Sequence, residues 1–301
     1  MAGTPTYAVP PGFLGVTRGD PAAFVVAGVP LDLGTTNRAG TREGPAAIRR
    51  ASRMLTDGDH PEHRVEPARM DLADIGDFSL ALGDIPASLA AIEEQAARIG
   101  HLIALGGEHG ITLPLLRALR KRLGAPVGLV HVDAHVDTWP DNFGQAYAHG
   151  SPFYHAIREG LVDPHRMIQI GIRSPVQNDV MDWTLAQGVT VLSALDVHAS
   201  TPAVVSERIR NVVGGGSTYL SFDIDALDPA FAPGTGTPEV GGLASWQTQA
   251  ILRALKTVHF VGMDIVEVAP AYDHAEITAL AAATMVWEYL ALVGRKRASL
   301  S

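Results

Sequence analysis

The chain has 301 residues, 47% of them hydrophobic and 18% charged, which suffices for a large buried core and excludes an intrinsically disordered protein. A net charge of −9, without a basic cluster beyond residues 117–122, argues against nucleic-acid binding, and the lack of Cys excludes disulfides, thiolate metal sites and a Cys nucleophile. Because residues 1–15 carry no basic segment followed by an apolar core, and no uncharged apolar run reaches the roughly 18 residues of a membrane span, we expect a soluble, cytoplasmic protein without membrane partners.

Residues 1–22 are rich in Pro and Gly and are expected to form an N-terminal extension to a single domain over residues 23–301. Within that domain, short apolar runs alternate with helical patterns. The expected strands are residues 23–30, 70–76, 101–106, 126–132, 167–172, 189–192, 218–223 and 259–266. Most of these runs are continuously apolar rather than alternating, which is typical of strands covered on both faces.

Amphipathic helices are expected in the intervals between these strands. Residues 86–99 place an apolar residue at every third or fourth position from Leu89 to Ile99, which gives one apolar stripe. A second helix is expected over residues 276–292. A strand followed by a helix, repeated along the chain, predicts a parallel sheet flanked by helices.

Polar side chains of the metal-binding type follow four of the expected strands. They are His109 after 101–106, Asp133, His135 and Asp137 after 126–132, Asp223 and Asp225 at the end of 218–223, and Glu267 after 259–266. The carboxyl ends of parallel strands lie along one edge of the sheet, so we expect these side chains to converge. One such residue alone is usually a cap or a turn former, but delivery from four strands indicates a functional site.

The spacing of two within each Asp and His segment puts the side chains on one side of an extended backbone. Six of these residues together offer four carboxylates and two imidazoles: His109, Asp133, His135, Asp137, Asp223 and Asp225. Two divalent ions would balance the four negative charges, and oxygen-rich ligands with some imidazole favour Mn²⁺. Two such ions can share a water and generate a nucleophile, which predicts hydrolysis. A two-metal phosphoesterase, which would need basic groups that these segments lack, and a non-catalytic metal-binding protein are the alternatives from other classes.

Four segments resemble the signature segments of the ureohydrolases, the family of arginases and agmatinases. They are GGEHGITLP (106–114), HVDAHVDT (131–138), SFDIDALDPAFAPGTGTPEVGGL (221–243) and VGMDIVEVAPAYD (261–273). Residues 28–49 also resemble the agmatinase branch. The resemblance implies an arginase-like three-layer αβα fold with a central, mostly parallel sheet of about eight strands. It also implies two Mn²⁺ ions per subunit, hydrolysis of a guanidinium group to urea and an amine, and a homohexamer or homotrimer.

The resemblance further assigns roles to individual residues. It implies one Mn²⁺ bound by His109, Asp133, Asp137 and Asp223, and a second bound by His135, Asp133, Asp223 and Asp225. His149 matches the residue that gives a proton to the leaving amine, and Glu267 matches the residue that holds the guanidinium. Both roles suit the side chains, because a carboxylate pairs with a planar cation and His titrates near neutral pH. A helix-capping role for His149 and a salt-bridge role for Glu267 are the simpler alternatives; Asp228 is expected to form a turn and Asp264 to support the ligands.

Two departures from the family pattern bear on function. Glu108 and Gly110 stand where Asp and Ser are common, and the loop over residues 138–149 lacks the polar pattern with which arginases hold the α-carboxylate and α-amine of arginine. Agmatine therefore fits better, with Asp141, Tyr147 or Ser151 as candidates to accept its distal amine. Guanidinobutyrate or another guanidino acid is the alternative substrate, and it would need a cation near the distal end of the site.

Overall fold

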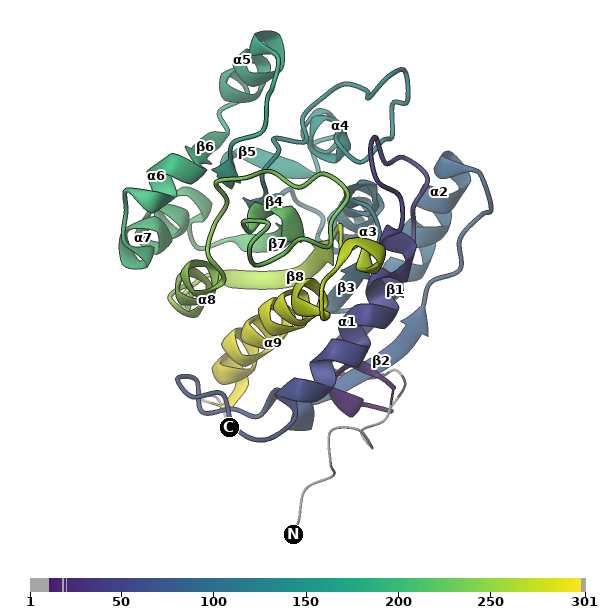
Figure 1. Cartoon of the computed structure of the whole chain (residues 1–301), viewed down its shortest axis with the longest axis vertical. Helices are drawn as coiled ribbons and strands as arrows, with labels where there is room; N and C mark the ends of the chain where they lie inside the picture. Colours follow the sequence, from purple (N-terminus) through teal and green to yellow (C-terminus); the bar gives the residue numbers. More distant parts are fainter. Residues whose placement is uncertain (1–10, 18, 20, 299–301) are drawn as a thin grey trace.

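Eight parallel strands form a single central sheet in the order β2-β1-β3-β8-β7-β4-β5-β6 (Figure 1). This arrangement comes from a computed structural model that describes residues 11–17, 19 and 21–298. The strands are β1 Phe24–Val29, β2 Leu72–Asp77, β3 Leu102–Gly106, β4 Val127–Val132, β5 Val162–Ile172, β6 Thr190–Ser193, β7 Ser217–Asp223 and β8 His259–Val266. The predicted parallel sheet of about eight strands is confirmed.

Strand β5 differs most from its expected bounds, because it starts at Val162 rather than near residue 167. The sequence from Asp163 to Arg166 is polar and contains a proline, so its composition gave no strand signal. The pairing of β4 with β5 accommodates this segment through a register shift between Val127 and Leu129.

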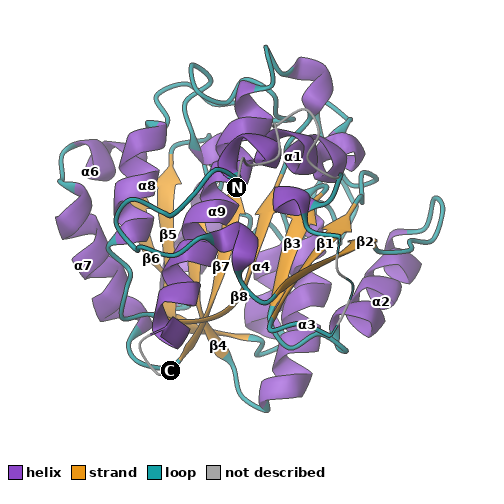
Figure 2. Cartoon of the chain, turned by 90° about the horizontal axis from the view of Figure 1, so that it is seen from below, coloured by secondary structure: helices purple, strands orange, loops and turns teal. Residues whose placement is uncertain are grey.

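Helices cover both faces of the sheet and complete the predicted three-layer αβα architecture (Figure 2). They are α1 Gly44–Ser52, α2 Ile85–Ala96, α3 Thr112–Leu123, α4 Pro152–Arg158, α5 Asn178–Ala186, α6 Ala194–His198, α7 Pro202–Val213, α8 Ser245–Arg253 and α9 Ile277–Ala298. On one face α1, α9, α8 and α7 contact one another in that order, and on the other α2, α3 and α4 do the same. Each face has its own large cluster of buried apolar side chains.

Helix α9 is long and apolar enough, by length and composition alone, to cross a membrane over residues 277–295. In the structure 67% of that segment is buried inside the protein. Its Val286 and Tyr289 are fully buried, and the helix packs on α1, α8 and β8. These contacts are those of a core helix.

The proposed boundary at residue 22 is not tested by the structure, and residues 1–10 of the expected extension lie outside the described residues. Within the described part, Phe13 and Leu14 are buried in the core. The N–H of Phe13 donates to Asp74 and the N–H of Leu14 donates to Ser52. These two residues therefore pack as part of the domain.

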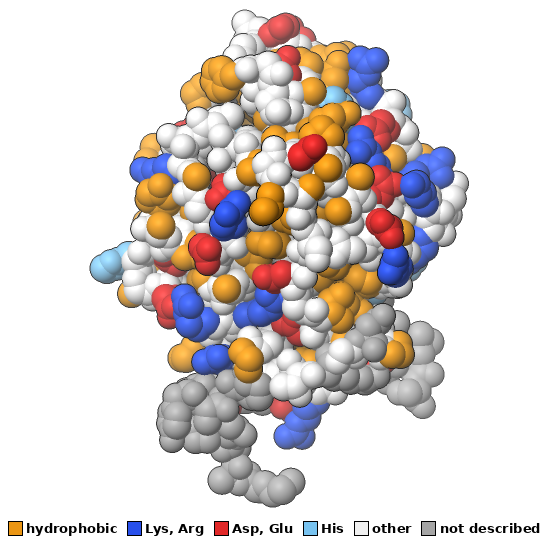
Figure 3. Space-filling model, turned by 90° about the vertical axis from the view of Figure 1, so that its right-hand side faces the viewer, with side chains coloured by type: hydrophobic (Ala, Val, Ile, Leu, Met, Phe, Trp, Pro, Cys, Tyr) orange, Lys and Arg blue, Asp and Glu red, His pale blue; other side chains and the backbone are white. Residues whose placement is uncertain are grey.

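The side of the molecule that carries α1, α2 and β2 has a mixed surface. In Figure 3, Lys and Arg side chains on this side are interspersed with Asp and Glu rather than gathered by sign. Such a surface offers no continuous basic patch to a polyanion.

The sheet order brings together the four strands that carry the predicted site. Strands β3, β8, β7 and β4 are direct neighbours in the middle of the sheet, and all four run in the same direction. Their carboxyl ends therefore meet at one edge, where the loops that follow them can enclose a site.

Candidate metal centre

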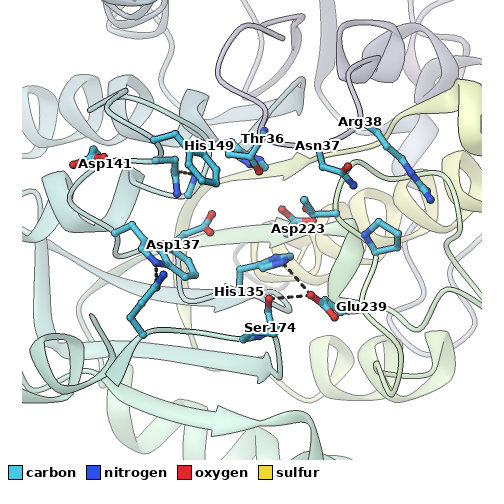
Figure 4. Close-up of a pocket in the computed structure, with 18 residues that line it drawn as sticks. Thr36, Asn37, Arg38, His135, Asp137, Asp141, His149, Ser174, Asp223 and Glu239 are labelled. Carbon is cyan, nitrogen blue, oxygen red and sulfur yellow. Dashed lines mark hydrogen bonds and ion pairs between the residues drawn. The ribbon is translucent and has the colours of Figure 1, made fainter. Parts of the chain in front are cut away.

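The structure brings all eight residues predicted from the sequence to this edge of the sheet. They are His109, Asp133, His135, Asp137, His149, Asp223, Asp225 and Glu267. All but His135 are buried, and His135 is partly exposed. Figure 4 shows His135, Asp137, His149 and Asp223 directed toward one cavity.

One cluster of potential ligand atoms surrounds Nδ1 of His109. This nitrogen lies 3.1 Å from Oδ2 of Asp133, 2.9 Å from Oδ2 of Asp137 and 3.2 Å from Oδ2 of Asp223. It is buried and has no hydrogen-bond partner among the described residues. Ligands on adjacent corners of an octahedron lie about 3 Å apart when each is about 2.1 Å from the metal. The four atoms therefore suit a divalent ion placed between them.

A second cluster adjoins the first and shares Asp133 with it. Nδ1 of His135 lies 3.3 Å from Oδ1 of Asp133 and 3.2 Å from Oδ2 of Asp225. The two oxygens of Asp133 thus face the two different histidines. Asp133 therefore contributes one oxygen to each cluster, while Oδ1 of Asp223 accepts the backbone N–H of Asp225.

The electrostatics of the site favour bound cations. Burial, together with the neighbouring carboxylates of Asp225 and Asp133, raises the pKa of Asp223 well above its ordinary value. Buried carboxylates this close repel each other unless positive charge compensates them. The donors are carboxylate oxygens and imidazole nitrogens in a chain without Cys, so they suit a hard or borderline divalent ion rather than a thiolate-binding one.

A hydrogen-bonded chain fixes the orientation of His109. Its Nε2 lies 2.8 Å from Oγ of Ser221, and that hydroxyl donates to Asp264 at 2.7 Å. Asp264 also accepts the hydroxyls of Thr112 and Tyr219. Because Nε2 carries the proton toward Ser221, Nδ1 keeps its lone pair for a metal. Asp264 therefore lies where a ligand-supporting residue is needed.

His131 was not singled out from the sequence, although it lies two residues before Asp133 and continues the same spacing. Its Nε2 donates to Oδ2 of Asp133 at 2.7 Å, and its Nδ1 accepts from Nε2 of Gln169 at 3.1 Å. Its ring lies close enough to His109, Asp133 and Asp137 to belong to the same group of potential ligands. Because both ring nitrogens have partners, His131 is better placed to orient Asp133 than to bind an ion.

His149 and Glu267 form a buried pair beside the first cluster. Nδ1 of His149 lies 3.1 Å from Oε1 of Glu267, and the same oxygen accepts the backbone N–H of His109 at 2.7 Å. Oε2 of Glu267 is buried and has no hydrogen-bond partner in the part of the chain that the structure describes. Glu267 and Asp137 have left-handed backbone conformations, with φ of 65° and 49°, and non-glycine residues held in this region cluster at functional sites.

The charges of this pair are matched. Burial alone would lower the pKa of His149, but the adjacent carboxylate of Glu267 raises it to about 9. Burial alone would raise the pKa of Glu267, but the imidazole of His149 lowers it. At neutral pH the pair is therefore an imidazolium and a carboxylate, which is the salt bridge expected as the simpler alternative for Glu267. His149 does not stand at the N-cap of helix α4, which is Ser151. The salt bridge leaves Oε2 of Glu267 without a hydrogen-bond partner among the described residues.

The cavity above the clusters has a volume of about 680 Å³. Its outer wall includes Asp141, Glu239 and Arg38. Oε1 of Glu239 lies 4.0 Å from Nε2 of His135, and the guanidinium of Arg38 lies 5.0 Å from the ring centre of Tyr272. The wall thus offers both acidic groups and one guanidinium to the distal end of a substrate.

Of the three residues considered for the distal amine, only Asp141 lines this cavity. The hydroxyl of Ser151 donates to the carbonyls of Ala146 and Ala148, and the ring of Tyr147 packs against His155. Residues 138–149 contain no such cation, and Arg38 could not be predicted from them because it comes from the loop after β1.

The arginase family matches residues 22–291. An agmatinase of Salmonella paratyphi B is 45% identical over 282 residues, covering 92% of this chain and 89% of that protein. A crystal structure of a hypothetical agmatinase from Burkholderia thailandensis has a TM-score of 0.90 and 44% identity, covering 98% of this chain and 94% of the other. A proclavaminate amidino hydrolase from Streptomyces clavuligerus has a TM-score of 0.91 and 37% identity, covering 97% and 99%.

Proposed function

The chain belongs to the arginase family, and with that premise we propose that it hydrolyses agmatine to putrescine and urea. It is a ureohydrolase for a guanidino substrate, and its cluster of His and Asp side chains suits a binuclear metal site. The observation that carries the proposal is the buried, unpartnered Oε2 of Glu267 next to that cluster. A carboxylate oxygen in this position can accept the N–H groups of a planar guanidinium cation.

We propose that two Mn²⁺ ions occupy the site. One set of ligands is His109, Asp133, Asp137 and Asp223, and the other is His135, Asp133, Asp223 and Asp225. When bound, two such ions lower the pKa of a water molecule and so supply a nucleophile near neutral pH. The unpartnered Nδ1 of His109 and the raised pKa of Asp223 support this occupancy.

The residues of the chain would do the rest of the chemistry. Oε2 of Glu267 would hold the guanidinium with its central carbon over the metal site and stabilise its charge. His149, protonated at neutral pH, would give a ring proton to the alkylamine nitrogen as the bond between that nitrogen and the guanidinium carbon breaks. Putrescine would then leave as an ammonium ion, and urea would remain with the oxygen of the added water molecule.

A guanidino acid such as 4-guanidinobutyrate is the second candidate substrate, and Arg38 is the observation in its favour. Among the described residues that line the cavity, Arg38 is the only Lys or Arg, and it could pair with a carboxylate. Asp141 and Glu239 on the same wall favour instead the distal ammonium of agmatine. We give more weight to agmatine because of the two acidic groups and the agmatinase relatives.

Assembly and location are also proposals. We propose a homohexamer or homotrimer in the cytoplasm, on the strength of the family resemblance and of a sequence without Cys. Light scattering of the purified protein would measure the assembly, and a monomer at working concentration would contradict it.

The proposed reaction is tested by measuring urea release from agmatine, arginine and 4-guanidinobutyrate side by side, with Mn²⁺ supplied. We expect the highest kcat/KM with agmatine and little urea from arginine. A preference for 4-guanidinobutyrate would establish the second candidate, and no urea from any of the three would overturn the proposal.

A further inference from the structure

The loop after β1 reaches into the site and holds His149. The backbone N–H of His149 donates to the carbonyl of Gly34, and the backbone N–H of Thr36 donates to Nε2 of His149 at 3.2 Å. Oγ1 of Thr36 lies 2.8 Å from the same Nε2. The imidazole is therefore held at one nitrogen by Glu267 and at the other by Thr36.

The contact with Thr36 serves both protonation states of His149. When Nε2 is unprotonated, it can accept the backbone N–H of Thr36. When Nε2 carries a proton, the hydroxyl of Thr36 can accept it, because a hydroxyl both donates and accepts. A proton-transfer residue needs a ring orientation that does not change as it gains and loses its proton. The position of Thr36 therefore determines whether the His149 ring keeps its orientation.

Glu108 fixes the turn that presents Thr36. Its Oε2 accepts the backbone N–H groups of Leu33 and Gly34, each at 2.7 Å. Glu108 is fully buried and comes from the loop after β3, 74 residues away from Gly34. Burial raises the pKa of Glu108 to about 7, so the carboxyl group is partly protonated near neutral pH, and Oε2 can accept both N–H groups in either state.

Gly110 gives Glu108 the room to reach the turn. A Cβ atom added at Gly110 would lie 3.3 Å from Oε1 of Glu108, and one added at Gly34 would lie 2.8 Å from it. Contacts of 3.3 Å are tighter than most real Cβ contacts, so a side chain at position 110 would press on the carboxylate. The two departures from the family pattern, Glu108 and Gly110, thus occupy one shared space.

We propose that Glu108 is a positioning residue for His149, acting through residues 33–36, and that Gly110 is the partner that admits its longer side chain. The proposal rests on the role of His149 in the proposed function. It predicts that the effects of substitutions at positions 108 and 110 on kcat are not additive. It also predicts that each substitution changes the position of the His149 imidazole.

The test is a cycle of Glu108→Asp, Gly110→Ser and the double variant, with Glu94→Asp on the exposed face of α2 as control. Each single variant should lower kcat for agmatine about tenfold with KM changed less than twofold, and should shift the ring nitrogen signals of His149 in NMR of the metal-free protein. The double variant should recover kcat to within about threefold of the wild type and return those signals. Thr36→Val, which keeps the N–H but removes the hydroxyl, should shift the same signals and alter the pH profile of kcat.

Unchanged His149 signals in both Glu108→Asp and Thr36→Val would overturn the proposal, as would purely additive effects on kcat in the cycle. The NMR measurement does not depend on turnover. If the wild type released no urea while the His149 signals followed the cycle, the positioning role would stand and only the proposed reaction would fail.

Discussion

Oε1 of Glu267 contacts both Nδ1 of His149, at 3.1 Å, and the backbone N–H of His109, at 2.7 Å. One carboxylate oxygen thus links the proposed proton donor to a proposed metal ligand. The other oxygen is buried and accepts no hydrogen bond from the described residues. A guanidinium held by Oε2 would therefore lie within one contact of both the proposed metal site and the proposed proton donor.

Glu267→Gln should lower kcat/KM for agmatine by about 10- to 150-fold, which corresponds to one lost charge-assisted hydrogen bond. Gln can still accept the N–H of His109, but its amide presents N–H groups to a substrate that only donates. Bound metal per chain, measured by elemental analysis, should be unchanged. Loss of metal together with activity would mean that Glu267 supports the metal site instead.

The pKa of His149 predicts how its effect on stability varies with pH. Because the folded-state pKa of about 9 lies above the ordinary value of 6.5, protonation stabilises the fold fully below about pH 6.5, and this is lost as pH rises through about 9. In metal-free protein, the free energy of unfolding should exceed that of His149→Gln by on the order of 3 kcal/mol more at pH 6 than at pH 10. Denaturant unfolding at both pH values checks this, and an equal difference at both would refute it.

Arg38→Ala separates the two candidate substrates. If agmatine is the substrate, removing this cation from the cavity wall should raise kcat/KM for agmatine about two- to fivefold, because a like charge is lost. The value for 4-guanidinobutyrate should fall. Arg98→Ala, which removes an exposed partner of Glu94, is the matched control and should change neither value. A tenfold fall with agmatine would show that Arg38 contributes to binding it.

Glu288→Ala should destabilise the fold by about 3–5 kcal/mol without direct effect on the site. The buried carboxylate of Glu288 in α9 pairs with Arg253 and accepts from His60 at 2.8 Å. Its removal leaves Nε2 of the buried His60 without this acceptor and leaves Arg253 with only its more exposed partner Glu62. Glu94→Ala, which breaks an exposed pair with Arg98, should cost less than about 1 kcal/mol. Equal losses in chemical denaturation would contradict the importance of burial.

The convergence of the proposed ligand residues could be predicted because the strand pattern is local. Continuous apolar runs locate the strand ends, and the spacing of two after residue 132 puts Asp133, His135 and Asp137 on one side of the chain. The same spacing extends back to His131, which could have been found in this way. The sheet order could not be predicted, since placing β8 between β3 and β7 depends on packing between distant segments.

The residues of the outer part of the site could not be predicted from the sequence either, because their positions also depend on contacts between distant segments. Thr36 and Arg38 follow β1, and nothing in their own segment shows that the loop crosses to the residues after β4. Glu108 and Gly110 were recognised as departures, but their shared space appears only when the turn at Leu33 and Gly34 is placed against them. Loop contacts of this kind are set by tertiary packing.

The central claim is that the His and Asp cluster holds the metal ions that make urea release possible. The most direct test is urea release from agmatine by Asp223→Ala supplied with Mn²⁺, measured beside the wild type and beside Asp179→Ala, a control at an exposed carboxylate in α5. We expect the wild type and the control to release urea and Asp223→Ala to release none above background. Urea release by Asp223→Ala at the wild-type rate would contradict the account.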